Sequence, residues 1–184
     1  MADSWSRIDA DGEPVAAGAG GAHQCVFDAR TGLLWEIKQA APGAQDRDAL
    51  YSWYFESREY SMGESGTMDG GACSIARCDT SGLIEQVNQN GLCGHRDWRL
   101  PLREELLTLG DQRLVETGQV LDPAFFPFDR AGEYWTGSTF RLYPDAAWLV
   151  DSRTGLDRAE RKTEARFVRL VRGEVFNPRR PQSD

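Results

Sequence analysis

The sequence has no long hydrophobic run, little lysine and no recognisable export signal. None of its apolar segments approaches the ~20 residues that a helix needs to cross a bilayer, so we expect no insertion into a membrane. Residues 1–6 lack the basic start and apolar middle of a signal peptide. We therefore expect either a cytoplasmic protein or an exported protein whose signal has been removed.

Positive charge is also scarce. Only two of the 21 basic residues are lysines, Lys38 and Lys162, and the formal net charge is −8. This balance disfavours a nucleic-acid-binding protein, which would need a basic face to meet phosphate groups. Hydrophobic residues make up 40% of the 184-residue chain, which suits one globular domain with a core of its own.

The four cysteines lie at positions 25, 73, 78 and 93, and none follows in the rest of the chain. Four cysteines can form two disulfides in three pairings. A zinc site is the alternative, since Cys73 and Cys78 have the spacing of one zinc knuckle and a histidine lies near each of the other two. No second knuckle is present, and the setting is rich in glycine and loops. Disulfides, and with them an oxidising compartment, are favoured.

The chain divides into a lead-in, one domain and a tail. Residues 1–22 are polar and rich in Gly and Ala and predict a flexible lead-in, residues 23–174 form the domain, and residues 175–184 predict a disordered tail. Inside the domain, apolar content and turn residues predict a strand pair over 25–38, a short edge strand over 51–55, and strands over 133–137, 146–151 and 165–172. Capping signals predict helices from residue 79 or 80 to about residue 90, and over 101–109.

Several specific motifs occur in a fixed order. They include Cys25-Val-Phe-Asp-Ala-Arg-Thr-Gly-Leu-Leu-Trp-Glu36, Gly91-Leu-Cys-Gly-His-Arg-Asp-Trp-Arg-Leu-Pro101, Arg103-Glu-Glu-Leu106 and Val168-Arg-Leu-Val-Arg-Gly173. In this combination the chain resembles the bacterial Lcl C-terminal domain family over residues 25–173. The resemblance implies an α+β, C-type lectin-like fold, with two helices packed on small twisted antiparallel sheets with long irregular loops. It also implies that a strand within 26–37 lies beside the last strand, over 167–171.

With this fold in view we favour the disulfides Cys25–Cys93 and Cys73–Cys78. The first would tie the initial strand to the end of the first helix, and the second would close a local loop. A Cys78–Cys93 bond is less attractive because about 15 Å of helix separates these residues, whereas the Cα atoms of a disulfide lie within about 7 Å.

Few residue combinations point to catalysis, and we expect no enzyme. Cys93 and His95 are the one nearby thiol and base, and a bridged Cys93 could not serve as a nucleophile. Glu104 and Glu105 point to different faces of a helix, which suits its dipole better than a glycosidase pair. Trp98, although flanked by charges, predicts a core residue. The related formylglycine-generating enzymes use a late cysteine pair, and no cysteine follows position 93.

The segment 136–162 is the strongest candidate for a binding surface, because loops on a rigid scaffold commonly carry recognition. Its candidate ligand-binding residues are Arg141, Tyr143, Asp145, Arg153, Asp157 and Arg158. A merely solvated loop is the alternative. Asp145, Asp151 and Asp157 offer oxygen ligands for calcium, but the motifs of calcium-dependent sugar-binding lectins are absent, so we expect neither a metal nor a cofactor.

These observations predict a non-enzymatic ligand-recognition or adhesion module of an exported bacterial protein, which binds a glycan or a protein. A polyanionic glycan would require the basic residues of the segment to gather on one face; these are Arg141, Arg153, Arg158, Arg161 and Lys162. The alternative is a structural or assembly module of a surface or pilus-associated oligomer without a small ligand. A homo-oligomer is compatible with both.

Overall fold

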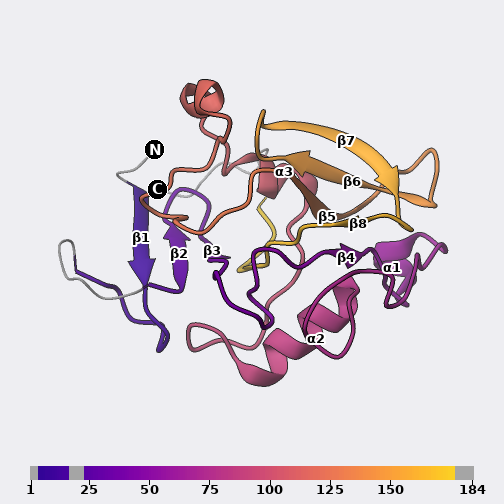
Figure 1. Cartoon of the computed structure of the whole chain (residues 1–184), viewed down its shortest axis with the longest axis horizontal. Helices are drawn as coiled ribbons and strands as arrows, with labels where there is room; N and C mark the ends of the chain where they lie inside the picture. The colour runs from indigo at the N-terminus through magenta and orange to yellow at the C-terminus, as the bar shows by residue number, and fades with distance from the viewer. Residues whose placement is uncertain (1–3, 17–22, 177–184) are drawn as a thin grey trace.

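The computed structural model describes residues 4–16 and 23–176, which form small antiparallel sheets, short helices and long connecting loops. Figure 1 shows a four-stranded sheet at the left and a three-stranded sheet at the upper right, with the longest helix below them. The predicted α+β class is confirmed, and the C-type lectin-like relationship stays a prediction.

The four-stranded sheet joins the two ends of the described chain. Its order is β1 (Trp5–Ile8), β2 (Cys25–Asp28), β3 (Leu33–Glu36) and β9 (Val171–Arg172), and every neighbouring pair is antiparallel. Gly32 takes the positive φ, 72°, in the turn between β2 and β3. Because β3 pairs with β9, the predicted neighbourhood of an initial strand and the last one is confirmed.

Strand β1 differs from the flexible lead-in predicted over residues 1–22. Trp5 is only 8% exposed, and its ring meets Phe125 and Phe126 edge-on at centroid distances of 5.2 and 5.5 Å. The partners of Trp5 lie about 120 positions further along the chain, so local composition gave no sign of this packing. Residues 1–3 and 17–22 of the predicted lead-in, and 177–184 of the predicted tail, lie outside the described residues.

The first predicted helix is confirmed as α2 (Thr80–Asn90). The carboxylate of Asp79 accepts the Gly82 amide at 2.7 Å and caps its start, and Gly91 ends it with a φ of 80°. A four-residue helix that the sequence did not predict, α1 (Arg58–Ser61), precedes it in the long region after β4 (Tyr51–Ser52).

The second predicted helix is shorter than expected, because α3 spans only Arg103–Leu107. The backbone of Leu102 is still extended, and its amide donates to the carboxylate of Glu105 at 2.8 Å. This cap begins the helix two residues after Pro101. A 3₁₀ helix, η2 (Gln112–Thr117), follows.

The three-stranded sheet is a meander of β5 (Glu133–Thr139), β6 (Ala146–Asp151) and β7 (Leu156–Arg161). Strand β7 corrects the prediction that this part of the 136–162 segment is loop, since it pairs with β6 along its whole length. Its charged sequence concealed it, because an edge strand faces solvent and needs no apolar alternation.

The predicted strand over 165–172 is divided into β8 (Ala165–Arg166) and β9. Strand β8 pairs with β4 (Tyr51–Ser52), which is the short strand predicted near residue 51, whereas β9 pairs with β3. Between them, Phe167 forms a parallel bridge with Tyr134 of β5. One segment thus contacts three different neighbours in turn.

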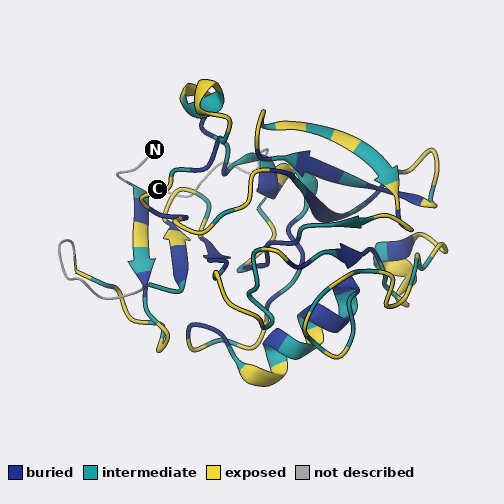
Figure 2. Cartoon of the chain, viewed as in Figure 1, coloured by how far each residue is buried: buried dark blue, intermediate teal, exposed yellow. Residues whose placement is uncertain are grey.

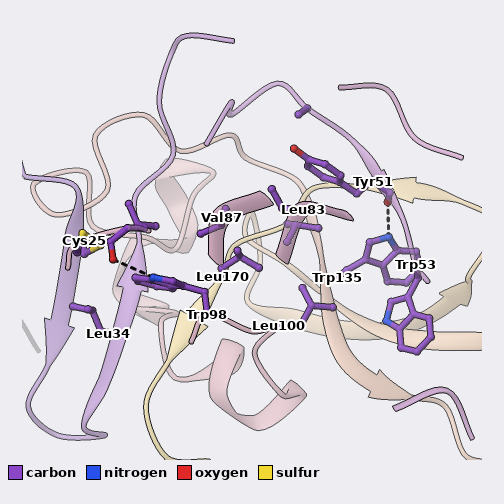
Figure 3. Close-up of a cluster of buried hydrophobic side chains, with 14 of the residues drawn as sticks. Cys25, Leu34, Tyr51, Trp53, Leu83, Val87, Trp98, Leu100, Trp135 and Leu170 are labelled. Atoms are coloured by element: carbon purple, nitrogen blue, oxygen red, sulfur yellow. Dashed lines mark hydrogen bonds between the residues drawn. A yellow bond between two sulfur atoms is a disulfide. The ribbon is translucent and has the colours of Figure 1, made fainter. Parts of the chain in front are cut away.

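Buried residues recur along the strands and along α2 (Figure 2). Tryptophans are among the largest of the buried side chains (Figure 3). Trp98 is buried, as predicted, and so are Trp35 and Trp135, which the strand motifs also predict as core residues. Trp148 carries the same prediction but is only partly buried, so that prediction is wrong. The indole of Trp98 donates to the Leu92 carbonyl at 3.1 Å, and that of Trp135 donates to the Tyr51 carbonyl at 2.9 Å. These bonds satisfy polar groups that would otherwise destabilise the core.

Both predicted disulfides are confirmed. Cys25 of β2 is bonded to Cys93, just after α2, with 6.5 Å between the Cα atoms, and Cys73 is bonded to Cys78 at 5.5 Å. All four cysteines lie within the described residues and are used in this way, so the zinc alternative is wrong.

Candidate ligand-binding site

The turn between β5 and β6 carries two of the most exposed large side chains in the described chain. Leu142 is 77% exposed and Tyr143 is 65% exposed. The turn itself is ordered by backbone hydrogen bonds, from the Tyr143 amide to the Phe140 carbonyl at 3.2 Å and from the Ala146 amide to the Tyr143 carbonyl at 2.9 Å. The two exposed side chains therefore stand on a fixed backbone.

A stack of side chains, here named the aromatic column, supports Tyr143 from below. The guanidinium of Arg103 in α3 lies 4.3 Å from the Trp148 ring centre, Trp148 meets Phe140 edge-on at 5.1 Å, and Phe140 lies 5.9 Å from Tyr143. Asp157 of β7 forms an ion pair with Arg103 at its base. Cation–π and edge-on contacts of this kind hold rings in place.

A groove of about 290 Å³, named here the hairpin groove, runs between this turn and the end of β7. Its lining residues are Phe140, Tyr143, Asp145, Ala146, Ala159, Glu160 and Arg161. Among the described residues, the side chains of Asp145 and Arg161 make no hydrogen bond or ion pair. The groove thus combines an aromatic face with a carboxylate and a guanidinium that are available to a ligand.

Only three of the six predicted ligand-binding residues come together. Arg141, Tyr143 and Asp145 share the β5–β6 turn. Arg153 lies in the β6–β7 turn, where it pairs with Asp151 at 2.6 Å. Successive turns of a meander lie at opposite ends of the sheet, so Arg153 cannot join the other three. The remaining two, on β7, have partners within the protein.

One of these two, Arg158, belongs to a closed ring of four charges. Arg158 and Arg166 each contact both Glu133 and Glu160, at 2.7 to 2.9 Å. The hydrogen bond from Arg158 lowers the pKa of Glu133. The four charges compensate one another, so Arg158 stabilises the attachment of β7 rather than facing a ligand. The other, Asp157, is occupied with Arg103.

Lys162 lies at the far end of β7, but it is buried, with 1% of its surface exposed. Its ammonium donates to the carbonyls of Ser61 at 3.2 Å and Glu64 at 2.7 Å, and it lies 3.9 Å from the Trp53 ring centre. Burial lowers the pKa of Lys162 to about 8. Its backbone amide donates to the Asp145 carbonyl at 2.9 Å, which attaches the β5–β6 turn to this buried anchor.

The basic residues of the 136–162 segment therefore do not form one positive face. Lys162 is buried, Arg153 lies at the opposite end of the sheet, and Arg158 is neutralised by two glutamates. Arg141 and Arg161 remain near the turn. A polyanionic glycan would need these residues on one face, so this distribution disfavours such a ligand.

The other sequence candidates have structural partners. Cys93 is bonded to Cys25, so no free thiol stands beside His95. Arg99 forms two hydrogen bonds with the buried carboxylate of Glu105, at 2.7 and 2.8 Å. Glu105 is therefore the partner of a buried ion pair as well as a helix cap, which corrects the simpler interpretation of Glu104 and Glu105 as complements of the helix dipole.

No three His, Cys, Asp or Glu side chains in residues 4–16 and 23–176 are grouped to hold a metal ion. Asp151 and Asp157 are engaged with arginines, and Asp145 lies at the other end of the meander from Asp151. The same described residues contain no helix long and apolar enough to cross a membrane.

Phe140 was not named from the sequence at all, and Arg161 was named only among the basic residues of the segment, not among the candidate ligand-binding residues. The spacing of Phe140 and Tyr143 around an exposed leucine was a usable signal, because two aromatic residues in a short interstrand segment are unusual for a purely solvated loop. Arg161 could not be placed without knowing that β7 returns alongside β6.

Comparison with known proteins adds one finding. The family profile described as the Lcl C-terminal domain matches residues 24–172. Neither the curated proteins nor the solved structures compared with the chain contain a match. The matched family and the two disulfides agree with a domain of an extracellular bacterial protein. Since the match covers most of its length, the chain belongs to the Lcl C-terminal domain family.

Proposed function

We propose that this domain is a non-enzymatic recognition module of an exported bacterial protein and that it binds a glycan in the hairpin groove. The observation that carries the proposal is Tyr143, which is exposed at the end of the aromatic column beside the uncommitted side chains of Asp145 and Arg161. An exposed ring on a braced support loses little conformational entropy when it packs on a ligand, which favours binding.

The groove matches the chemistry of a sugar ring. One face of a pyranose presents C–H groups that pack on an aromatic ring, and its edge presents hydroxyls that bond to carboxylates and guanidinium groups. Tyr143 supplies the first kind of contact, and Asp145 and Arg161 supply the second. The groove, at about 290 Å³, lies at the lower end of the range for small-ligand sites and has room for a single ring.

Binding to an array of glycans, with calcium and again with EDTA, tests the proposal. We expect saturable binding in both conditions and a loss of about tenfold in Tyr143→Ala, since one stacked ring contributes up to about 1.4 kcal/mol. Leu156→Ala is the matched control, because Leu156 is 68% exposed at the opposite end of the meander and should leave binding unchanged.

The other outcomes are informative. An array without binding in either condition refutes glycan recognition and favours a protein ligand or an assembly role. Binding that Tyr143→Ala leaves intact shows that the hairpin groove is not the site. Binding that disappears in EDTA contradicts the expectation that no metal takes part.

A further inference from the structure

A second groove, of about 320 Å³, lies between the chain after β4 and the start of α2. We name it the tyrosine groove; its lining residues are Tyr54, Phe55, Glu56, Ser57, Tyr60, Arg77 and Ser81. None of them was among the residues that the sequence pointed to as a site. Three aromatic side chains and four polar ones face a common space.

The aromatic wall of the tyrosine groove is built on the core. Phe55 meets the buried ring of Trp53 edge-on at 4.9 Å and stacks on Tyr60 at 5.0 Å with an interplanar angle of 27°. The backbone of Tyr54 is fixed at both polar atoms, because its amide donates to the Thr80 hydroxyl and its carbonyl accepts from the same hydroxyl, both at 2.9 Å. The rings are therefore preorganised for stacking.

The polar side chains are oriented by the protein, and some of their hydrogen-bonding groups remain available to a ligand. Arg77 donates to both carboxylate oxygens of Asp79, at 3.0 and 3.1 Å, which orients its guanidinium and raises its pKa. The hydroxyl of Tyr54 donates to one oxygen of Glu56 at 3.2 Å, and the other oxygen has no hydrogen-bond donor among the described residues. The Cys73–Cys78 disulfide fixes the loop that carries Arg77.

The one basic side chain that lines this groove already has acidic partners. Asp79 neutralises Arg77, and Glu85 approaches the same guanidinium at 3.8 Å, so an anionic ligand finds no free positive charge. Glu56 has no basic partner among the described residues, so its carboxylate can accept hydrogen bonds from a ligand. A neutral ligand with an apolar face and several hydroxyls accounts for all the lining residues, since planar carboxylate and guanidinium groups each bond to neighbouring hydroxyls.

We propose that the tyrosine groove is a second carbohydrate site, which binds one neutral pyranose ring stacked on its aromatic wall. The proposal goes beyond the hairpin groove and does not require that groove to bind. The two grooves nevertheless share one end of the molecule, since the Thr139 hydroxyl at the end of β5 donates to the Tyr60 carbonyl of α1 at 2.6 Å (Figure 1). Two sites on one rigid end would strengthen binding to a branched or repeating glycan through avidity.

An NMR titration of the whole chain tests this directly. The probes are the methyl glycosides of glucose, galactose, mannose and N-acetylglucosamine, with sorbitol as the control, because sorbitol has comparable hydroxyls but no ring face. We expect at least one glycoside to shift the signals of Tyr54, Phe55, Tyr60 and Arg77 saturably, with dissociation constants on the order of 1 mM, which is usual for one small ring. Sorbitol should shift none of them.

Variants assign the site. Tyr60→Ala should weaken glycoside binding about tenfold, and Glu56→Ala, a change at an exposed side chain that leaves the fold intact, should weaken it several-fold. Leu156→Ala is the matched control and should leave these shifts unchanged, because Leu156 is exposed at the opposite end of the three-stranded sheet. The proposal is overturned if no glycoside shifts these signals, if sorbitol shifts them equally, or if Glu56→Ala and Tyr60→Ala both bind as the wild type does. Shifts confined to the hairpin groove would support the proposed function and refute this second site.

Discussion

Lys162 gives the sharpest prediction, because it is a buried ammonium without a carboxylate partner at hydrogen-bond distance. Burial lowers its pKa from the ordinary 10.5 to about 8, against the opposing charges of Glu64 and Asp145. Between these two values the unfolded chain binds a proton that the folded protein has released. The free energy of unfolding should therefore rise with pH in this window.

The size of the effect follows from the two pKa values. Integrating the difference in bound protons from pH 7 to pH 9.5 gives a gain of about 2 kcal/mol in the free energy of unfolding. The neutral amine keeps two N–H groups, which suffice for the carbonyls of Ser61 and Glu64. Measurement stops at pH 9.5 because burial raises the pKa of Tyr51 and Tyr134, and their ionisation in the unfolded chain opposes the trend at higher pH.

Two measurements check this reasoning. Urea unfolding at pH 7 and pH 9.5 should show the gain in the wild type and its absence in Lys162→Met. The chain contains only two lysines, so the ¹³Cε spectrum of the protein labelled at lysine should show two signals, one titrating near pH 8. Loss of that signal in Lys162→Met assigns it. If both signals titrate above pH 10, or if the variant shows the same gain as the wild type, the account of Lys162 as a desolvated ammonium is wrong.

Two further predictions concern stability. Replacing the Cys25–Cys93 pair by alanines should lower the free energy of unfolding by about 4 kcal/mol, whereas replacing Cys73 and Cys78 should lower it by about 2 kcal/mol. The difference arises because the first bond closes a loop of 68 residues and the second a loop of five. Equal losses in urea unfolding would contradict this. Trp5→Ala should lower the free energy of unfolding by about 3 kcal/mol and Trp5→Phe by much less, since a phenyl ring can still pack on Phe125 and Phe126. If Trp5→Ala does not lower the melting temperature, packing of β1 does not stabilise the fold.

Local signals explain which elements the sequence could predict. Helix α2 was recognisable because Asp79 and Gly91 mark its ends through contacts within a few residues. Strand β7 could not be recognised, because its charged sequence suits an exposed edge strand. Its pairing with β6 depends on the tertiary fold. The division of 165–172 among three neighbours likewise depends on where the rest of the chain lies.

The candidate site shows the same limit. Tyr143 and Asp145 could be proposed from the sequence because they sit in a polar segment between two recognisable strands. The exclusion of Arg153 needed the direction of each strand, and the burial of Lys162 needed the position of Trp53, about 110 residues earlier. The tyrosine groove joins residues 54–60 to residues 77–81 through a disulfide loop, and no local pattern announces that contact.

The antiparallel order β1-β2-β3-β9 has a consequence for mounting the domain on a larger assembly. In this order β1 and β9 run in opposite directions, so the start of the first strand and the end of the last lie at the same end of the strands, on the two opposite edges of the sheet. Figure 1 shows that sheet at the left and α1, beside both grooves, at the right. A linker joined at either end would therefore attach the domain through the four-stranded sheet. Several copies attached in this way to one support would present both grooves to the solvent.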